Sequence, residues 1–212
     1  MRHYRKSFCQ GLVKYKHYLY ESSGAYKHNS FIVKYDLRSG KVIQKYEFPY
    51  RNEIPYQSDF AEGITIIRRE VMCVMWKTRK IYYFDLELNL IRIKSFPFAE
   101  CWGLTNNCKS LIMTNGTNQI TFICPTTFAV TNTITVKYNK LNAICYKRVF
   151  IYANIWKTNK IIQICASTGN VVSDIIIIGE QHYNPEYCLN GIACWRRKLI
   201  ITGKCWRRFY MV

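Results

Sequence analysis

The chain has 212 residues, of which 31 are Lys or Arg and 13 are Asp or Glu, so its formal net charge is +18. With 49% hydrophobic residues, it is long enough to bury a sizeable core. Only four histidines are present and no cysteine pair has the CxxC spacing, which argues against a structural zinc site. We therefore expect neither a metal nor a cofactor.

The N-terminal stretch, MRHYRKSFCQGLVK (1–14), is charged and lacks the apolar centre of a secretory signal. As written, this predicts a cytoplasmic protein, and a secreted or periplasmic one if the true start lies upstream of Met1. The apolar run VVSDIIII (171–178) is too short to cross a bilayer and contains Asp174. We expect no membrane partner.

Five short stretches recur along the chain, each with a polar or Trp residue, then a small residue, then Leu or Ile. They are CQGL (9–12), AEGI (61–64), CWGL (101–104), LNAI (141–144) and LNGI (189–192). We call the second residue of each stretch a marker residue: Gln10, Glu62, Trp102, Asn142 and Asn190. Successive marker residues are 52, 40, 40 and 48 positions apart, which indicates a repeat of about 40 residues.

A second pair of segments keeps the same period. MWKTRKIYYFD (75–85) and IWKTNKIIQIC (155–165) match at five residue types and lie 80 positions, or two repeats, apart. Tyr, Ile, Val, Thr and Phe dominate the regular segments, and no window shows a long helical period. The pattern predicts an all-β fold, a single five-bladed β-propeller over 1–212. Its four-stranded blades have inner strands starting near 9, 61, 101, 141 and 189.

The ten cysteines show no metal-binding spacing. Cys124 and Cys165 occupy equivalent positions in two repeats, and Cys145 falls on an expected inner strand. No His stands at a marker position to activate a cysteine nucleophile. We expect buried free thiols in a reducing compartment.

Positive charge is unevenly distributed, because no acidic residue lies between Cys101 and Ser173. This could favour anionic partners. The basic residues nevertheless come as separate pairs rather than on one element, and no nucleic-acid-binding motif is present. The pairs are Arg68-Arg69, Lys147-Arg148, Arg196-Arg197 and Arg207-Arg208. We expect any nucleic-acid binding to be non-specific and screened by salt, with no specific nucleic-acid partner.

Several ordered motifs resemble the plant and bacterial type of glutaminyl-peptide cyclotransferase, a family of five-bladed β-propeller enzymes. The resemblance runs from about Ser7 to Val212 and includes LYESSGAYKHNSFIVKYDLRSGKV (19–42), FAEGITII (60–67) and CWGLT (101–105). It continues through LIMTNGTNQITFICPTTFAV (111–130) and IYANIWKTNKI (151–161) to the segment 190–206.

The resemblance implies an activity: conversion of the N-terminal glutamine of a peptide, or of a small glutamine amide, into pyroglutamate with loss of ammonia. It implies catalytic or polar roles for Gln10, Glu62, Asn142 and Lys204. It implies substrate contacts from Trp76, Trp102 and Trp156. Without it, the three Trp residues would be interpreted as core. We expect a monomer that acts without a metal.

Glu62 is an acidic residue at the start of an otherwise apolar strand. A lone Glu at a strand end is usually a solvated edge residue. Its marker position instead places it with the other marker residues at one end of the propeller. There one carboxylate could take a proton from the substrate ammonium and deliver it to the departing nitrogen. Aromatic walls would raise its pKa and Lys204 would lower it, so the sequence leaves the sign open.

The chain also departs from the family pattern. The family's NELE motif is NAIC here (142–145), so Ala143 and Cys145 replace two acids. Asn115, Cys124 and Cys101 replace the Asp of SDG, the Asp of DP and the Gly before the marker Trp. Members of the family usually have a strand upstream of the first inner strand that closes the last blade. Because the sequence begins at the first inner strand, we expect either an open edge on one blade or a true start upstream of Met1.

These departures and the charge keep a second hypothesis open. A catalytically degenerate propeller could serve as a binding module, for example for anionic partners, because this fold hosts many functions. Retention of the implied acid, donors and three Trp residues favours the enzyme.

Overall fold

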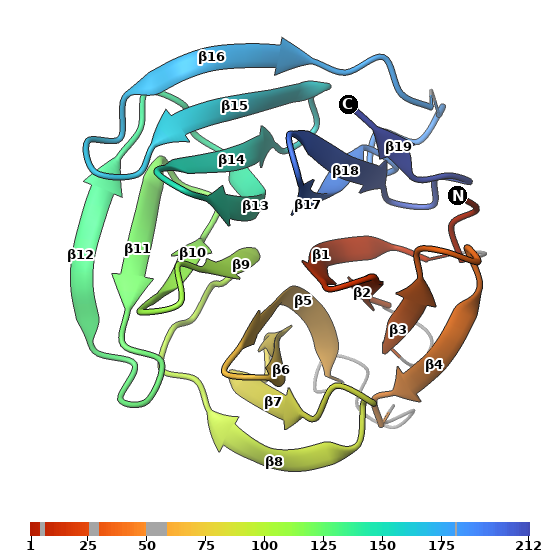
Figure 1. Cartoon of the computed structure of the whole chain (residues 1–212). Helices are drawn as coiled ribbons and strands as arrows, with labels where there is room; N and C mark the ends of the chain where they lie inside the picture. The colour runs from red at the N-terminus through yellow and green to blue at the C-terminus, as the bar shows by residue number, and fades with distance from the viewer. Residues whose placement is uncertain (5–6, 26–29, 50–58, 181) are drawn as a thin grey trace.

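The computed structural model describes residues 1–4, 7–25, 30–49, 59–180 and 182–212. In these ranges the chain forms five antiparallel sheets and no helix, so no helix could span a membrane. The sheets form a ring of five blades around a central axis, with β1, β5, β9, β13 and β17 nearest the axis (Figure 1). The expected all-β five-bladed β-propeller is confirmed.

Each blade is a meander whose strands follow chain order from the axis outward. Blade one contains β1 (Cys9–Tyr15), β2 (Tyr18–Ser23), β3 (Phe31–Asp36) and β4 (Val42–Glu47). Blade two contains β5 (Phe60–Ile67), β6 (Glu70–Trp76), β7 (Lys80–Phe84) and β8 (Leu90–Ser95). Blade three contains β9 (Gly103–Asn106), β10 (Leu111–Thr114), β11 (Gln119–Ile123) and β12 (Val130–Thr135). Blade four contains β13 (Leu141–Lys147), β14 (Phe150–Ile155), β15 (Lys160–Cys165) and β16 (Val171–Ile176). Blade five contains β17 (Leu189–Trp195), β18 (Lys198–Gly203) and β19 (Tyr210–Met211).

Burial explains why the inner strands are apolar on both faces. Every residue of β5 is buried, whereas most of β4, β8 and β12 is exposed. Inner strands also approach one another closely near the axis, where small residues are required. A Cβ added at Gly63 would lie 2.6 Å from the Leu104 nitrogen, and one at Gly103 would lie 2.2 Å from the Asn142 oxygen. The small residue after each marker residue therefore permits close contact between neighbouring blades.

The hydrophobic core consists of layers between the blades. Tyr20 and Phe48 of the first blade pack with Ile64 and Phe84 of the second in one such layer. Each blade covers the face of the next, so the ring is stabilised by contacts between neighbouring sheets.

The last blade has three described strands rather than the four expected from the sequence. The segment at the N-terminus lies beside it: Arg2 and Arg208 form an isolated antiparallel bridge, and the Phe209 N–H donates to the Met1 carbonyl at 2.9 Å. His3 Nε2 lies 2.6 Å from Glu21 Oε1 of the first blade. Residues 1–3 thus join the last blade to the first at the edge that the sequence leaves open.

Candidate active site

Four of the five marker residues lie at irregularities in their strands. The pairing register shifts between Cys9 and Gly11, Ala61 and Ile64, Leu141 and Ile144, and Leu189 and Ile192. A bulge of this kind leaves a residue unpaired and redirects its side chain. Three of these four residues, Gln10, Glu62 and Asn142, line one pocket, and the fourth, Asn190, donates a hydrogen bond to Gln10.

All seven residues that the family resemblance implies line one pocket of about 330 Å³. The marker residues among them come from the starts of inner strands, and the others come from the ends of second strands or directly after them. Because first and second strands are antiparallel, these positions lie at the same end of the propeller. The seven are Gln10, Glu62, Trp76, Trp102, Asn142, Trp156 and Lys204, joined by Phe8 and Glu186.

The aromatic wall of the pocket is held by an acid that sequence reasoning missed. Trp76 Nε1 and Trp102 Nε1 donate to the same Glu100 oxygen, at 2.9 and 2.8 Å. Trp102 and Trp156 meet edge to face, with ring centroids 5.5 Å apart. Glu100 directly precedes CWGL, and this closeness to a marker was the only sequence signal for it.

Glu62 is a buried carboxyl with only 6% of its surface exposed. Burial raises its pKa well above the ordinary value, the Lys204 ammonium opposes the shift, and the Glu100 carboxylate adds to it. The sequence left this sign open, and in the structure burial prevails over Lys204.

Three polar side chains accompany Glu62 in the pocket. Lys204 is 5% exposed, and its Nζ lies 4.7 Å from the Phe8 ring centroid. Asn142 is also buried, and its Oδ1 has no hydrogen-bond partner among the described residues. Gln10 Oε1 accepts a hydrogen bond of 2.7 Å from Asn190 Nδ2. The pocket therefore contains one carboxyl of raised pKa facing several potential N–H donors.

Glu186 supplies a second pocket acid that sequence reasoning missed. It pairs with Lys157 at 2.6 Å, and the Lys157 Nζ lies 4.4 Å from the Trp156 ring centroid. Both partners are partly exposed, so the pair lies toward the solvent side of the pocket. No repeat or motif pointed to Glu186, because it precedes the last inner strand in an irregular segment.

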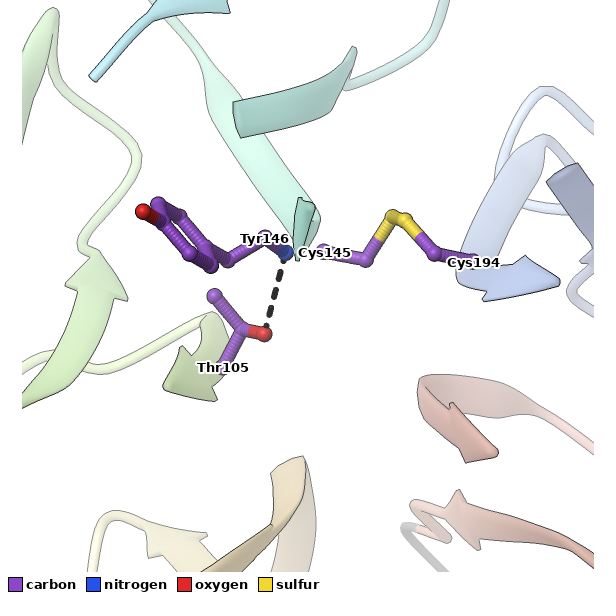
Figure 2. The surroundings of a disulfide bond; sticks show 4 residues. All are labelled: Thr105, Cys145, Tyr146 and Cys194. Atoms are coloured by element: carbon purple, nitrogen blue, oxygen red, sulfur yellow. Dashed lines mark hydrogen bonds between the residues drawn. A yellow bond between two sulfur atoms is a disulfide. The ribbon is translucent and has the colours of Figure 1, made fainter. Parts of the chain in front are cut away.

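One departure from the family pattern has a structural counterpart, shown in Figure 2. Cys145, in place of the second NELE acid, forms a disulfide with Cys194 and so joins β13 to β17. Next to it, the Tyr146 N–H donates to Thr105 Oγ1 at 3.2 Å. The expectation of free thiols is wrong for this pair, because the repeat placed the two inner strands in successive blades but did not fix the register between them. The other eight cysteines are free as expected, but only Cys9, Cys73 and Cys101 among them are buried, so the expectation of buried thiols is wrong for the other five.

Asn115, which replaces the Asp of the family's SDG motif, makes the hydrogen bonds of a turn. Asn115 Oδ1 accepts hydrogen bonds from the Thr117 N–H and hydroxyl, at 3.2 and 2.7 Å, as an aspartate would. Within the described ranges, no group of three or more His, Cys, Asp or Glu is arranged to hold a metal ion.

Comparison with known proteins agrees with this geometry. A family model described as glutamine cyclotransferase matches residues 1–212. Glutaminyl-peptide cyclotransferase of Arabidopsis thaliana is 30% identical over 225 residues, covering 97% of this chain and 67% of that protein. The crystal structure of Myxococcus xanthus glutaminyl cyclase is similar with a TM-score of 0.85 and 25% identity, covering 99% of this chain and 91% of that one. A nidogen/laminin complex, at a TM-score of 0.58 and 12% identity over 89% of this chain and 85% of that one, shares the fold alone.

Fold and pocket together define a five-bladed β-propeller with a buried carboxyl between aromatic walls at one end of its axis. The chain belongs to the glutamine cyclotransferase family.

Proposed function

We propose that this protein converts the N-terminal glutamine of peptides, or small glutamine amides, into pyroglutamate and ammonia, with Glu62 as general acid and base. The observation that carries the proposal is the buried Glu62 carboxyl, which shares one pocket with three Trp residues and three potential donors. Pyroglutamate forms when the α-amine attacks the γ-carboxamide carbon, so the site must deprotonate an ammonium and stabilise an oxyanion.

The raised pKa of Glu62 suits the first proton transfer. A peptide α-ammonium has a pKa of about 7.7–8.0, well above that of an ordinary Glu. Because burial raises the pKa of Glu62, the two values approach each other and the transfer becomes less unfavourable. The ionised carboxylate accepts a proton from the ammonium, which leaves a neutral amine as the nucleophile.

The amine then bonds to the carbon of the γ-carboxamide. The carbonyl oxygen of that carboxamide becomes an oxyanion. Lys204, Asn142 and Gln10 can donate N–H groups to that oxygen, and such donors act most strongly in a buried pocket. Protonated Glu62 returns a proton to the amide nitrogen. The oxyanion then collapses to a carbonyl, the carbon–nitrogen bond breaks, and ammonia leaves. The departing ammonia takes the extra proton from the new ring nitrogen, which leaves the neutral five-membered lactam and an ionised Glu62.

The pocket also favours a cationic, N-terminal substrate. The faces of the Trp residues can hold an ammonium, and Glu62 and Glu186 add negative charge. A pocket of about 330 Å³ accommodates one residue rather than a folded chain, so the rest of a peptide would leave through its mouth.

Mass spectrometry of a short peptide that begins with glutamine tests the proposal. The expected product has lost one ammonia, and the same peptide with an acetylated N-terminus should remain intact because its nitrogen is not nucleophilic. An unchanged glutamine peptide after prolonged incubation with folded protein would favour the degenerate binding module instead.

A further inference from the structure

The turns between first and second strands lie at the end of the propeller opposite the pocket. Each inner strand starts at the pocket and runs away from it, and a strand rises about 3.3 Å per residue. Residues near the far ends of all five inner strands line a separate hollow of about 170 Å³ on the axis: Val13, Ile66, Asn106, Tyr146 and Cys194 are among them. The far ends therefore converge as the near ends do.

Every one of these five hairpins carries positive charge. We call their cations the basic ring: Lys14 and Lys16, Arg68 and Arg69, Lys109, Lys147 and Arg148, and Arg196, Arg197 and Lys198. All except Lys14 and Lys147 are exposed. Three of the four basic pairs that seem scattered in the sequence thus occupy the same turn in three different blades.

Acidic side chains do not neutralise the basic ring. Glu70 is the one acid at the five turns between first and second strands, and both its oxygens accept hydrogen bonds from Arg92, at 2.6 and 2.7 Å. Across the part of the chain that the structure describes, no ion pair includes a member of the ring. Burial and, after it, the neighbouring Arg196 lower the pKa of Lys14. These cations repel one another, and a bound polyanion would relieve that repulsion.

Apolar side chains stand among the cations. Val149, at the tip of the β13–β14 turn beside Arg148, is 60% exposed. Trp195 is half-buried, and its ring centroid lies 5.7 Å from the Lys14 Nζ. Trp195 and Met211, with the three cations of the last hairpin, also line a hollow of about 430 Å³.

We propose that this end of the propeller docks on an anionic lipid surface, with the basic ring against the headgroups and Val149 and Trp195 at the interface. Cations that encircle the axis at one end suit a flat anionic partner that all five turns can reach together. Exposed apolar side chains between cations add the second ingredient of interfacial binding. The proposal replaces the sequence-based expectation of no membrane partner, which concerned spanning segments. It leaves the pocket facing away from the lipid.

Vesicle co-sedimentation of the full chain at low salt tests this surface. Vesicles of phosphatidylcholine containing about 30% phosphatidylglycerol should bind the protein, and pure phosphatidylcholine should not. The test variant carries Arg68→Asn, Arg148→Asn and Arg196→Asn. Asn suits these positions because all three have positive φ angles. Each cation near an anionic surface contributes about a fivefold gain in binding, so the triple variant should bind roughly 100-fold more weakly.

The matched control removes the same charge from the other parts of the surface, through Arg79→Asn, Lys137→Asn and Arg207→Asn. These three are exposed and lie outside both the ring and the pocket, so vesicle binding should stay within about twofold of the parent. Equal losses in both triple variants would show that only net charge matters and would overturn the proposal. So would failure to bind anionic vesicles, or tighter, ring-dependent binding to an RNA duplex at the same salt concentration.

Discussion

Asn190 donates a hydrogen bond of 2.7 Å from Nδ2 to Gln10 Oε1, where the last blade meets the first. The same amide donates to the Cys9 carbonyl at 3.0 Å, so the chain's last inner strand fixes a side chain on its first. With its oxygen engaged, Gln10 has its N–H groups left to face the pocket. Asn190 therefore orients a residue that we propose as an oxyanion donor.

Asn190→Ala should lower kcat by about tenfold, a fraction of the effect of deleting an oxyanion donor outright. Gln10 would remain but would no longer be oriented, so KM should change little. Steady-state kinetics with a glutamine peptide measure kcat and KM separately and so test both expectations.

Asn154→Ala is the matched control for that variant. Asn154 is equally buried and donates to the Leu189 carbonyl at 2.8 Å, but it does not line the pocket. Both variants should lose about 1–3 kcal/mol of stability. An equal fall in kcat in both would show that Asn190 acts only through stability.

Glu100→Gln should move the acidic limb of the kcat/KM profile to lower pH. Gln retains an oxygen that can accept from both Trp76 Nε1 and Trp102 Nε1, but it lacks the charge that raises the pKa of Glu62. Since Glu62 must be ionised to accept a proton, a lower pKa keeps it active at lower pH. If the acidic limb does not move, the Glu100 charge does not raise the pKa of Glu62. Glu100→Ala should also raise KM, because it removes the acceptor that holds Trp76 and Trp102.

The buried pair of His3 and Glu21 should make stability depend on pH. Burial lowers the pKa of His3, but the Glu21 charge and hydrogen bond raise it more, and the net shift is upward from 6.5. This contribution is fully present below the unfolded pKa of about 6.5 and is lost as pH rises through the folded value. Urea unfolding from pH 5.5 to pH 9 should show the decline in the parent.

His3→Gln should remove the His3 part of that decline and leave the part due to Glu62, whereas His17→Gln, a substitution of a partly exposed histidine, should leave the whole decline unchanged. A parent protein whose stability rises over the same pH range would contradict the assignment. Because residues 1–3 join the last blade to the first, His3→Gln should also destabilise at low pH, by about 3–5 kcal/mol if Glu21 is left unpaired.

The disulfide between Cys145 and Cys194 should be detectable and stabilising. Its sequence separation of 49 residues predicts a loss of about 2–4 kcal/mol when both cysteines are replaced by Ala. Urea unfolding measures the loss, and Cys108→Ala, which removes an exposed free thiol, is the control. Alkylation of all ten cysteines in denaturant without reductant would contradict the pairing.

The sequence predicted the blade count because each blade repeats a marker with one shape and a period near 40. It could also place Gln10, Glu62, Trp102 and Asn142 together, since equivalent positions in a ring share one end. It could not predict Glu186, which lies in an irregular segment, or the Cys145–Cys194 pair, which depends on the contact between two inner strands. The basic ring escaped detection for a related reason: its pairs are separate in sequence and meet only through the propeller topology.

Glu62→Gln should leave the fold intact and make it slightly more stable at neutral pH. A buried carboxyl whose folded pKa is raised above the unfolded value loses stability as pH rises between the two values. Gln cannot ionise and avoids that loss, so its urea midpoint at neutral pH should equal or exceed that of the parent.

The rate of ammonia release from a glutamine peptide, compared between the parent and Glu62→Gln at matched folded concentration, tests the central claim most directly. General acid–base catalysis typically contributes ~100- to 10,000-fold, so the variant should lose about 3–5 kcal/mol of transition-state stabilisation. Asn142→Ala and Lys204→Ala should each cost on the order of 100-fold, as single donors do. A parent that releases ammonia with Glu62→Gln within about twofold of its rate would contradict the role of Glu62 as acid and base.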